Sequence, residues 1–182
     1  VNLRVNSNRG NLTVSLMGQG SVPPPVVTPT PTPTPTAGPM SYVAKASAAL
    51  SDGRIIVAGV ANDGSKNRGF LMRFLTSGGK DTSFGTNGVV VSEFAGRNDS
   101  FNSIALDAAG NIVVAGSSYN ATDKDMAVGR FLPNGSMDTS FANVGWTVMN
   151  LGADDSANAV AVTTDNKIVI AGQTMMAGDQ DF

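Results

Sequence analysis

The sequence after Met40 repeats itself at a spacing of about 57 residues. The block at residues 54–59 returns at 111–116 and again at 167–172, each time ending in Ala-Gly. The blocks Arg-Phe-Leu and Asp-Thr-Ser-Phe also recur, each 57 residues further on. Because several independent blocks keep one spacing, this part of the chain is built from copies of a single structural unit.

Each unit predicts four short β-strands separated by turns. In the first unit we expect strands near residues 44–50, 54–60, 69–75 and 88–94. The second of these is apolar on both faces, which is typical of an inner strand that is covered on both sides. Glycine, asparagine and aspartate cluster between the strands, and no stretch shows a sustained helical period. The sequence therefore predicts an all-β fold in which each unit is one four-stranded antiparallel blade of a β-propeller.

Three motifs of the unit point to a family. They are Asp-Gly-Arg-Ile-Ile-Val-Ala-Gly at 52–59, Arg-Phe at 73–74 and Asp-Thr-Ser-Phe-Gly-Thr-Asn-Gly at 81–88. This combination resembles the delta-60 repeat, a family of bacterial, propeller-like and largely exported proteins with no agreed biochemical activity. The resemblance covers residues 42–182 and implies a protein that is secreted or held at the cell surface. The sequence departs from the pattern at 142–144 and 165–166, and both departures fall in turns.

The number of units predicts an incomplete array. Residues 42–182 hold roughly two and a half units, whereas propellers usually close with about four to eight blades. We therefore expect the chain to be a fragment of a longer protein, or its open edges to be completed by another chain, because an open sheet edge invites pairing. A homo-oligomer or an extracellular filament would provide such a neighbour.

Two different segments precede the repeats. Residues 1–21 hold two runs of alternating apolar and polar residues around a turn with Asn and Gly, which predicts a β-hairpin. A lone hairpin is marginally stable, so we interpret it as the end of an incomplete sandwich domain, and its pattern resembles the last two strands of bacterial immunoglobulin-like domains. Residues 22–41 hold eight of the nine prolines, many alternating with threonine. This composition predicts a semi-rigid linker and is typical of O-glycosylated stalks.

The composition argues against several kinds of chemistry. The chain has no cysteine and no histidine, which removes thiol nucleophiles, disulfides, a Ser-His-Asp triad and the usual zinc ligands. Twelve basic residues stand against fourteen acidic ones, which argues against a nucleic-acid partner. No apolar run approaches the ~20 residues of a membrane span. We expect no catalytic site and no cofactor, and we expect other protein chains or surface glycans as partners.

A charged pair and a phenylalanine recur in the first two units. These residues are Arg73, Asp81 and Phe84, and then Arg130, Asp138 and Phe141. Each arginine interrupts an apolar strand, and a partly buried guanidinium needs a partner, so we expect a structural ion pair with the aspartate eight residues on. A ligand-binding arginine is the alternative. Each phenylalanine is expected to fill the space between sheets.

Paired aspartates recur where a loop meets a strand. Asp123 and Asp125 return as Asp179 and Asp181. Alternate carboxylates with nearby carbonyl groups are able to hold calcium, which favours about six or more oxygen ligands. Since no complete Asp-x-Asp-x-Asp-Gly loop with its closing glutamate is present, a solvated acidic turn is the alternative.

These observations predict a non-catalytic, exported repeat protein that acts as a cell-surface or extracellular scaffold or adhesion component. The first alternative is a propeller that binds a glycan or a protein at its blade junctions, where Trp146 or Tyr119 would stack on a sugar unless they belong to the core. The others are a subunit of an extracellular filament and an enzyme whose site lies on further blades.

Overall fold

The computed structural model describes residues 2–8, 11–17, 40–94, 98–176 and 179–181. These residues form strands joined by turns, and the strands are β1 (Asn2–Asn8), β2 (Asn11–Met17), β3 (Ser41–Ala49), β4 (Ile55–Asn62), β5 (Asn67–Phe74), β6 (Val89–Ser92), β7 (Asn98–Leu106), β8 (Ile112–Tyr119), β9 (Lys124–Phe131), β10 (Trp146–Met149), β11 (Asp155–Val162), β12 (Ile168–Met176) and β13 (Asp179–Asp181). None of the described residues lies in a helix, so this part of the chain offers no helix long and apolar enough to cross a membrane.

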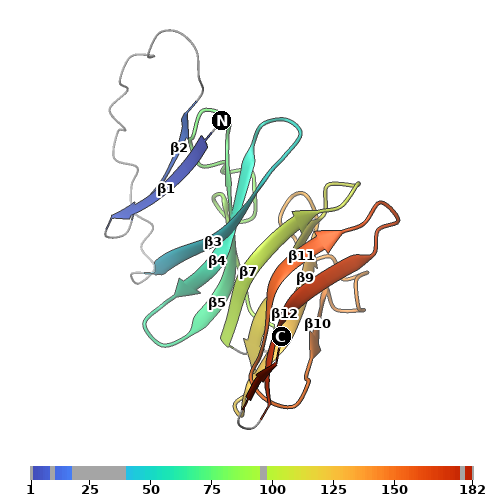
Figure 1. Cartoon of the computed structure of the whole chain (residues 1–182). Helices are drawn as coiled ribbons and strands as arrows, with labels where there is room; N and C mark the ends of the chain where they lie inside the picture. Colours follow the sequence, from blue (N-terminus) through green and yellow to red (C-terminus); the bar gives the residue numbers. More distant parts are fainter. Residues whose placement is uncertain (1, 9–10, 18–39, 95–97, 177–178, 182) are drawn as a thin grey trace.

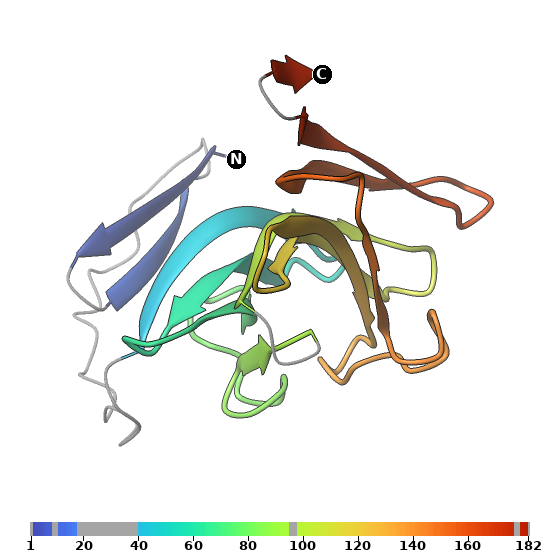
Figure 2. The same cartoon turned by 90° about the horizontal axis from the view of Figure 1, so that it is seen from below.

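Three antiparallel sheets follow one another along the repeats (Figure 1). The first sheet has the order β3-β4-β5-β6, the second β7-β8-β9-β10 and the third β11-β12-β13. The four strands predicted for the first unit are confirmed, with bounds that shift by up to three residues at the first of them. The expected all-β class and four-stranded antiparallel blades are confirmed as well. The three described sheets do not close into a ring (Figure 2).

The predicted N-terminal hairpin is present as β1 and β2. They pair antiparallel, from Asn2 opposite Met17 to Asn8 opposite Asn11. The linker predicted at 22–41 lies almost wholly outside the described residues, as do the last residues of the predicted N-terminal segment. An immunoglobulin-like origin for the hairpin stays a prediction.

An apolar core lies between the first and second sheets. Strand β7 packs across β3, β4 and β5. Side chains alternate between the two faces of a strand, so β4 directs Ile56 toward the second sheet, while β8 directs Ile112 back toward the first. Phe84 and Phe101 are fully buried between them. Burial of each such side chain contributes about 1.5–3 kcal/mol, which makes this core a main source of stability.

The same arrangement recurs between the second and third sheets. Strand β11 packs across β7, β8 and β9. The opposite face of β8 buries Val113 and Ala115 there, together with Ala157 of β11, and Phe141 is partly buried at the edge of this core. Strand β8, the second strand of the second unit, is therefore covered on both faces, as its apolar sequence predicts.

A bulge explains the glycine that recurs within each second strand. The pairing of β3 with β4 shifts at Ala44, and the equivalent shifts occur in β7 and β11. The bulged strand brings a backbone carbonyl against the opposite glycine. A Cβ on Gly59, Gly116 or Gly172 would lie 2.0, 1.8 or 2.0 Å from that oxygen. Only glycine fits there, which accounts for the repeated Ala-Gly.

Candidate functional site

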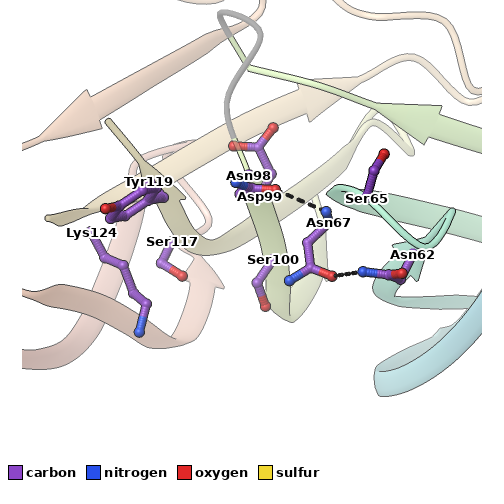
Figure 3. A pocket seen from close by; sticks show the side chains of 9 residues that line it. All are labelled: Asn62, Ser65, Asn67, Asn98, Asp99, Ser100, Ser117, Tyr119 and Lys124. Atoms are coloured by element: carbon purple, nitrogen blue, oxygen red, sulfur yellow. Dashed lines mark hydrogen bonds between the residues drawn. The ribbon is translucent and has the colours of Figure 1, made fainter. Parts of the chain in front are cut away.

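A polar cleft of about 380 Å³ lies where the first and second sheets meet (Figure 3). The adjoining ends of β4, β5, β7, β8 and β9 and the β4–β5 turn form its walls. Its lining residues are Asn62, Ser65, Asn67, Asn98, Asp99, Ser100, Ser117, Tyr119 and Lys124. Apart from Tyr119 these side chains are amides, hydroxyls and charged groups, so the cleft suits a polar ligand.

Three asparagines form one wall in a fixed orientation. The backbone N–H of Gly64 donates to Oδ1 of Asn62 at 2.7 Å, and that of Asn67 donates to Oδ1 of Asn98 at 2.9 Å. Nδ2 of Asn62 in turn donates to Oδ1 of Asn67 at 2.6 Å. A backbone N–H is always a donor, so these bonds identify which amide atom is oxygen. All three amide oxygens are engaged inside the wall.

Tyr119 and Lys124 form the opposite wall. They face each other in the pairing of β8 with β9. The Tyr119 hydroxyl donates to the carbonyl of Ala121 at 3.1 Å, and the side chain remains 38% exposed. The backbone N–H of Lys124 donates to Oδ1 of Asp154 at 3.0 Å, whereas its ammonium group lies 3.7 Å from Oδ2 of the same residue. The ring is held in place, and the ammonium group is only loosely paired.

Asp99 is the buried carboxyl group of the cleft. It accepts the backbone N–H of Phe94 on Oδ2 at 2.5 Å, which ties the end of the first unit to β7. Asp155 holds Leu151 in the same way in the next unit, at 2.7 Å. Burial raises the pKa of Asp99 to about 6, and the Phe94 N–H opposes this rise. The repeated contact indicates a structural role for both carboxylates.

A polar ladder joins the first strands of the three sheets beside the cleft. Nζ of Lys45 donates to Oγ of Ser100 at 2.7 Å and to Oδ1 of Asn102 at 2.8 Å. Nδ2 of Asn102 then donates to Oγ of Ser156 at 3.0 Å and to the carbonyl of Ala157 at 3.1 Å. Burial lowers the pKa of Lys45, and the nearby charge of Lys124 lowers it further. Ser100 also lines the cleft, so Lys45 adds a second cation at its edge.

The repeated arginines meet the aspartates eight residues on. Nε of Arg73 lies 2.8 Å from Oδ2 of Asp81, and the guanidinium carbon lies 4.7 Å above the Phe84 ring. The hydroxyl of Ser83 and the guanidinium groups of Arg54 and Arg73 hold the pKa of Asp81 well below its usual range. Nη1 of Arg73 also reaches the carbonyl of Pro133 in the second unit, at 2.7 Å. This pair therefore connects the two units.

The second unit repeats the pair in a more open setting. Nε of Arg130 lies 2.7 Å from Oδ2 of Asp138, and its guanidinium carbon lies 5.1 Å from the centre of the Phe141 ring. The hydroxyl of Ser140 and the Arg130 guanidinium lower the pKa of Asp138. The Arg130 side chain is 25% exposed, against 5% for Arg73.

Of the four calcium candidates, the structure describes the side chains of Asp123 and Asp125. Asp123 and Asp125 both accept from the Asn120 amide, at 2.6 and 3.0 Å, and Asp125 is buried. Asp179 and Asp181 lie in β13, where only the backbone pairing with β12 is described. Within the described residues, no group of three or more acidic side chains is placed to hold a metal ion. Calcium binding stays a prediction.

The two aromatic candidates for sugar stacking differ in their surroundings. Trp146 stacks on Phe94, with ring centroids 5.4 Å apart and planes 8° from parallel, at the edge of the first core. Tyr119 instead faces the cleft (Figure 3).

The sequence did not single out Asn62, Asn67 or Asn98, because asparagine in a turn is ordinary. Only the contact between two units shows that they form one wall.

Comparison with known proteins agrees with a propeller-like repeat. Residues 50–84 and 110–141 match a family described as a domain of unknown function (DUF5122), beta-propeller. The two matches fall in equivalent parts of the first and second units and end at Phe84 and Phe141. No curated protein matches the chain. The chain is thus similar to a propeller-like repeat family, whose description assigns no activity.

Proposed function

We propose that this chain is part of a non-catalytic, exported repeat protein that acts as a cell-surface or extracellular scaffold or adhesion component. One observation supports this above all: the charged groups that recur with the units make structural contacts, within a unit at Arg130 and between units at Arg73 and Asp99. Arg73 bonds Asp81 and the carbonyl of Pro133, while Asp99 bonds the backbone of Phe94. Such repetition is what a structural array needs, whereas a catalytic group is seldom required once per unit.

Export and surface location rest on the resemblance to the delta-60 repeat and on the Thr-Pro tract. The test is protease treatment of intact cells that produce the native protein, followed by detection with an antibody against residues 42–182. We expect the surface-exposed protein to be degraded while a cytoplasmic control protein survives. Protection in intact cells together with degradation after lysis would contradict the surface assignment.

The absence of catalysis is tested separately. The purified chain is incubated with panels of glycoside, ester and peptide substrates, and product formation is followed over hours. We expect no turnover above a buffer control. Hydrolase or lyase turnover that maps to residues 42–182 would contradict the proposal.

The second candidate function is binding of a glycan or a protein at the junction between units. The cleft of about 380 Å³ between the first two sheets favours it. This volume lies within the range of about 300–1,000 Å³ that small-molecule sites occupy. A glycan array probed with the full chain is the first test. The absence of any hit would argue against glycan binding and leave the scaffold role as the only proposal.

Assembly with further copies is favoured by one face of the third sheet. Val169 of β12 is 53% exposed, whereas its equivalents Ile56 and Val113 are fully buried beneath the next sheet. An apolar position of this kind is suited to covering by another sheet. Electron microscopy of the native material tests whether copies join into a filament, and dispersed particles of one chain each would argue against it.

A further inference from the structure

We infer that the cleft between the first and second sheets binds an acidic saccharide, whose carboxylate faces the N–H donors of Asn67, Asn98 and Lys124 and whose ring packs on Tyr119. The inference rests on the second candidate function, binding at the junction between units. It adds the chemical class of the ligand and the residues that recognise it.

The asparagine wall of the cleft presents mainly hydrogen-bond donors. The oxygens of Asn62, Asn67 and Asn98 already accept bonds within the wall. Among the described residues, the amide NH₂ groups of Asn67 and Asn98 have no acceptor, so each offers two donor hydrogens to a ligand. Figure 3 shows the Asn67 nitrogen directed away from Asn62, toward the middle of the cleft. The wall thus offers hydrogen-bond donors and suits a ligand that carries acceptor atoms.

The charged groups at the cleft are two lysines and the buried Asp99 carboxyl group. Lys124 lines the cleft, and Lys45 lies at its edge through its bond to Ser100. The two ammonium groups are close enough for the charge of Lys124 to lower the pKa of Lys45. The 3.7 Å separation between Nζ of Lys124 and Asp154, with both side chains about half exposed, leaves this ammonium group available. An anionic group between the two lysines would relieve their repulsion and form short, charge-assisted bonds.

An exposed aromatic ring in the cleft favours a ligand with an apolar face. Tyr119 presents a ring that is 38% exposed and anchored by its hydroxyl. A small inorganic anion has no apolar face to pack on such a ring, whereas the C–H face of a sugar packs well on it. The hydroxyls of Ser65, Ser100 and Ser117 line the same cleft and complement a polyhydroxylated ligand. Ring and donors together favour a saccharide that carries a carboxylate.

The next junction supplies an internal comparison. Asp154 occupies there the position of Asn98, since it accepts the backbone N–H of Lys124 as Asn98 accepts that of Asn67. This carboxylate exposes acceptor atoms where Asn98 exposes a donor. The donor-rich character therefore belongs to the first junction and is not a general consequence of the repeat. The comparison also shows that an aspartate at this position is compatible with the fold.

The test uses isothermal titration of the full chain with trigalacturonate and with the matched neutral probe, galactotriose. The decisive variant is Asn98→Asp, because it keeps the oxygen that accepts from Asn67 and replaces the NH₂ donor by a carboxylate. Asn150→Asp is the matched control. Oδ1 of Asn150 accepts the N–H of Gly152 at 2.8 Å on an exposed turn outside the cleft, so this variant makes the same charge change elsewhere.

We expect trigalacturonate to bind the wild-type chain and galactotriose to bind at least about tenfold more weakly, since charge-assisted bonds contribute more than neutral ones. Asn98→Asp should weaken trigalacturonate binding by about tenfold or more, and Asn150→Asp should leave it within about twofold. Tyr119→Ala should weaken the binding of trigalacturonate, and Tyr119→Phe should bind it about as tightly as the wild type does. Both aspartate variants should keep the wild-type urea midpoint, which excludes unfolding as the cause.

Three results would overturn the inference. Equal binding of both probes, or tighter binding of galactotriose, would remove the acidic class while leaving glycan binding in place. Binding of a polyglutamate peptide or of free acetate as strong as that of trigalacturonate would show a carboxylate site that does not recognise sugars. No binding of any probe, together with an empty glycan array, would remove the binding function itself and leave the scaffold proposal standing.

Discussion

Replacing Arg73 by methionine tests how strongly neighbouring units depend on the repeated arginine–aspartate pair. Arg73 donates from Nε to Asp81 at 2.8 Å and from Nη1 to the carbonyl of Pro133 at 2.7 Å, and its side chain is 5% exposed. Arg130 is the natural control. It makes the same Nε bond to Asp138, at 2.7 Å, but is 25% exposed. Among the described residues it bonds no carbonyl of another unit.

The expected magnitudes follow from this difference. Methionine keeps much of the packing of the aliphatic stem and removes the charge. Breaking a buried pair costs about 3–5 kcal/mol when the remaining charge is left uncompensated. Asp81 keeps Arg54, whose Nη1 lies 3.0 Å from Oδ2, so we expect a loss near the lower end, about 3 kcal/mol, for Arg73→Met. Arg130→Met should cost about 1 kcal/mol, because water screens its pair.

Urea unfolding followed by far-ultraviolet circular dichroism measures both losses. The comparison is valid if the two variants show the wild-type spectrum and the wild-type denaturant slope, since an altered slope would indicate a change in the unfolded or native ensemble. Equal losses, or a larger loss for Arg130→Met, would refute the reasoning that the contact with the second unit makes the first pair the more important one.

Three further predictions concern stability. Because burial raises the pKa of Asp99 from 3.8 to about 6, the folded state binds this proton more tightly than the unfolded state, and the contribution of Asp99 to stability falls as pH rises from about 4 to 6. Asp99→Asn leaves Asn98 and Phe94 in place, and its free energy of unfolding should rise by about 2 kcal/mol relative to that of the wild type between pH 4 and pH 7. Urea titrations at the two pH values measure this change, and a constant difference between variant and wild type would contradict the prediction. Gly116→Ala should lower the free energy of unfolding by about 3 kcal/mol or more and so lower the thermal midpoint, since its Cβ would lie 1.8 Å from a carbonyl oxygen. The control Gly79→Ala, with only a hydroxyl at 3.7 Å, should change the thermal midpoint little. Similar midpoints for the two variants would contradict the explanation by a bulge. Ala142 has φ of 49°, so Ala142→Gly should stabilise by about 0.5–1 kcal/mol in the same assay, and a loss would show that this turn carries no backbone strain.

Much of the fold was predictable from the sequence because its causes are local. Alternation, apolar runs and turn residues act over a few neighbouring residues, and the 57-residue repeat multiplies the signal. The strands near residues 54–60 and 69–75 were therefore placed correctly. The contacts of Arg73 with Asp81 and of Arg130 with Asp138 also lie within one unit, only eight residues apart.

The cleft was not predictable, because it belongs to no single unit. Its walls come from the β4–β5 turn and from β7, β8 and β9, so they meet only when one sheet packs on the next. Tyr119 and Trp146 illustrate the difference. Both were equal candidates in the sequence, and the packing places Trp146 against Phe94 and leaves Tyr119 at the cleft.

The sequence by itself determined the repeat, the strands of each unit and the pairs within a unit, because hydrogen bonding and alternation of side chains operate over short separations along the chain. Only the tertiary structure decided which face of each strand is buried against a neighbour, why Gly116 cannot be alanine, and that Asn67 and Asn98 line one cleft. These features depend on the stagger and stacking of whole sheets, where a displacement of one or two ångströms reverses the outcome, and no pattern of neighbouring residues encodes such a displacement.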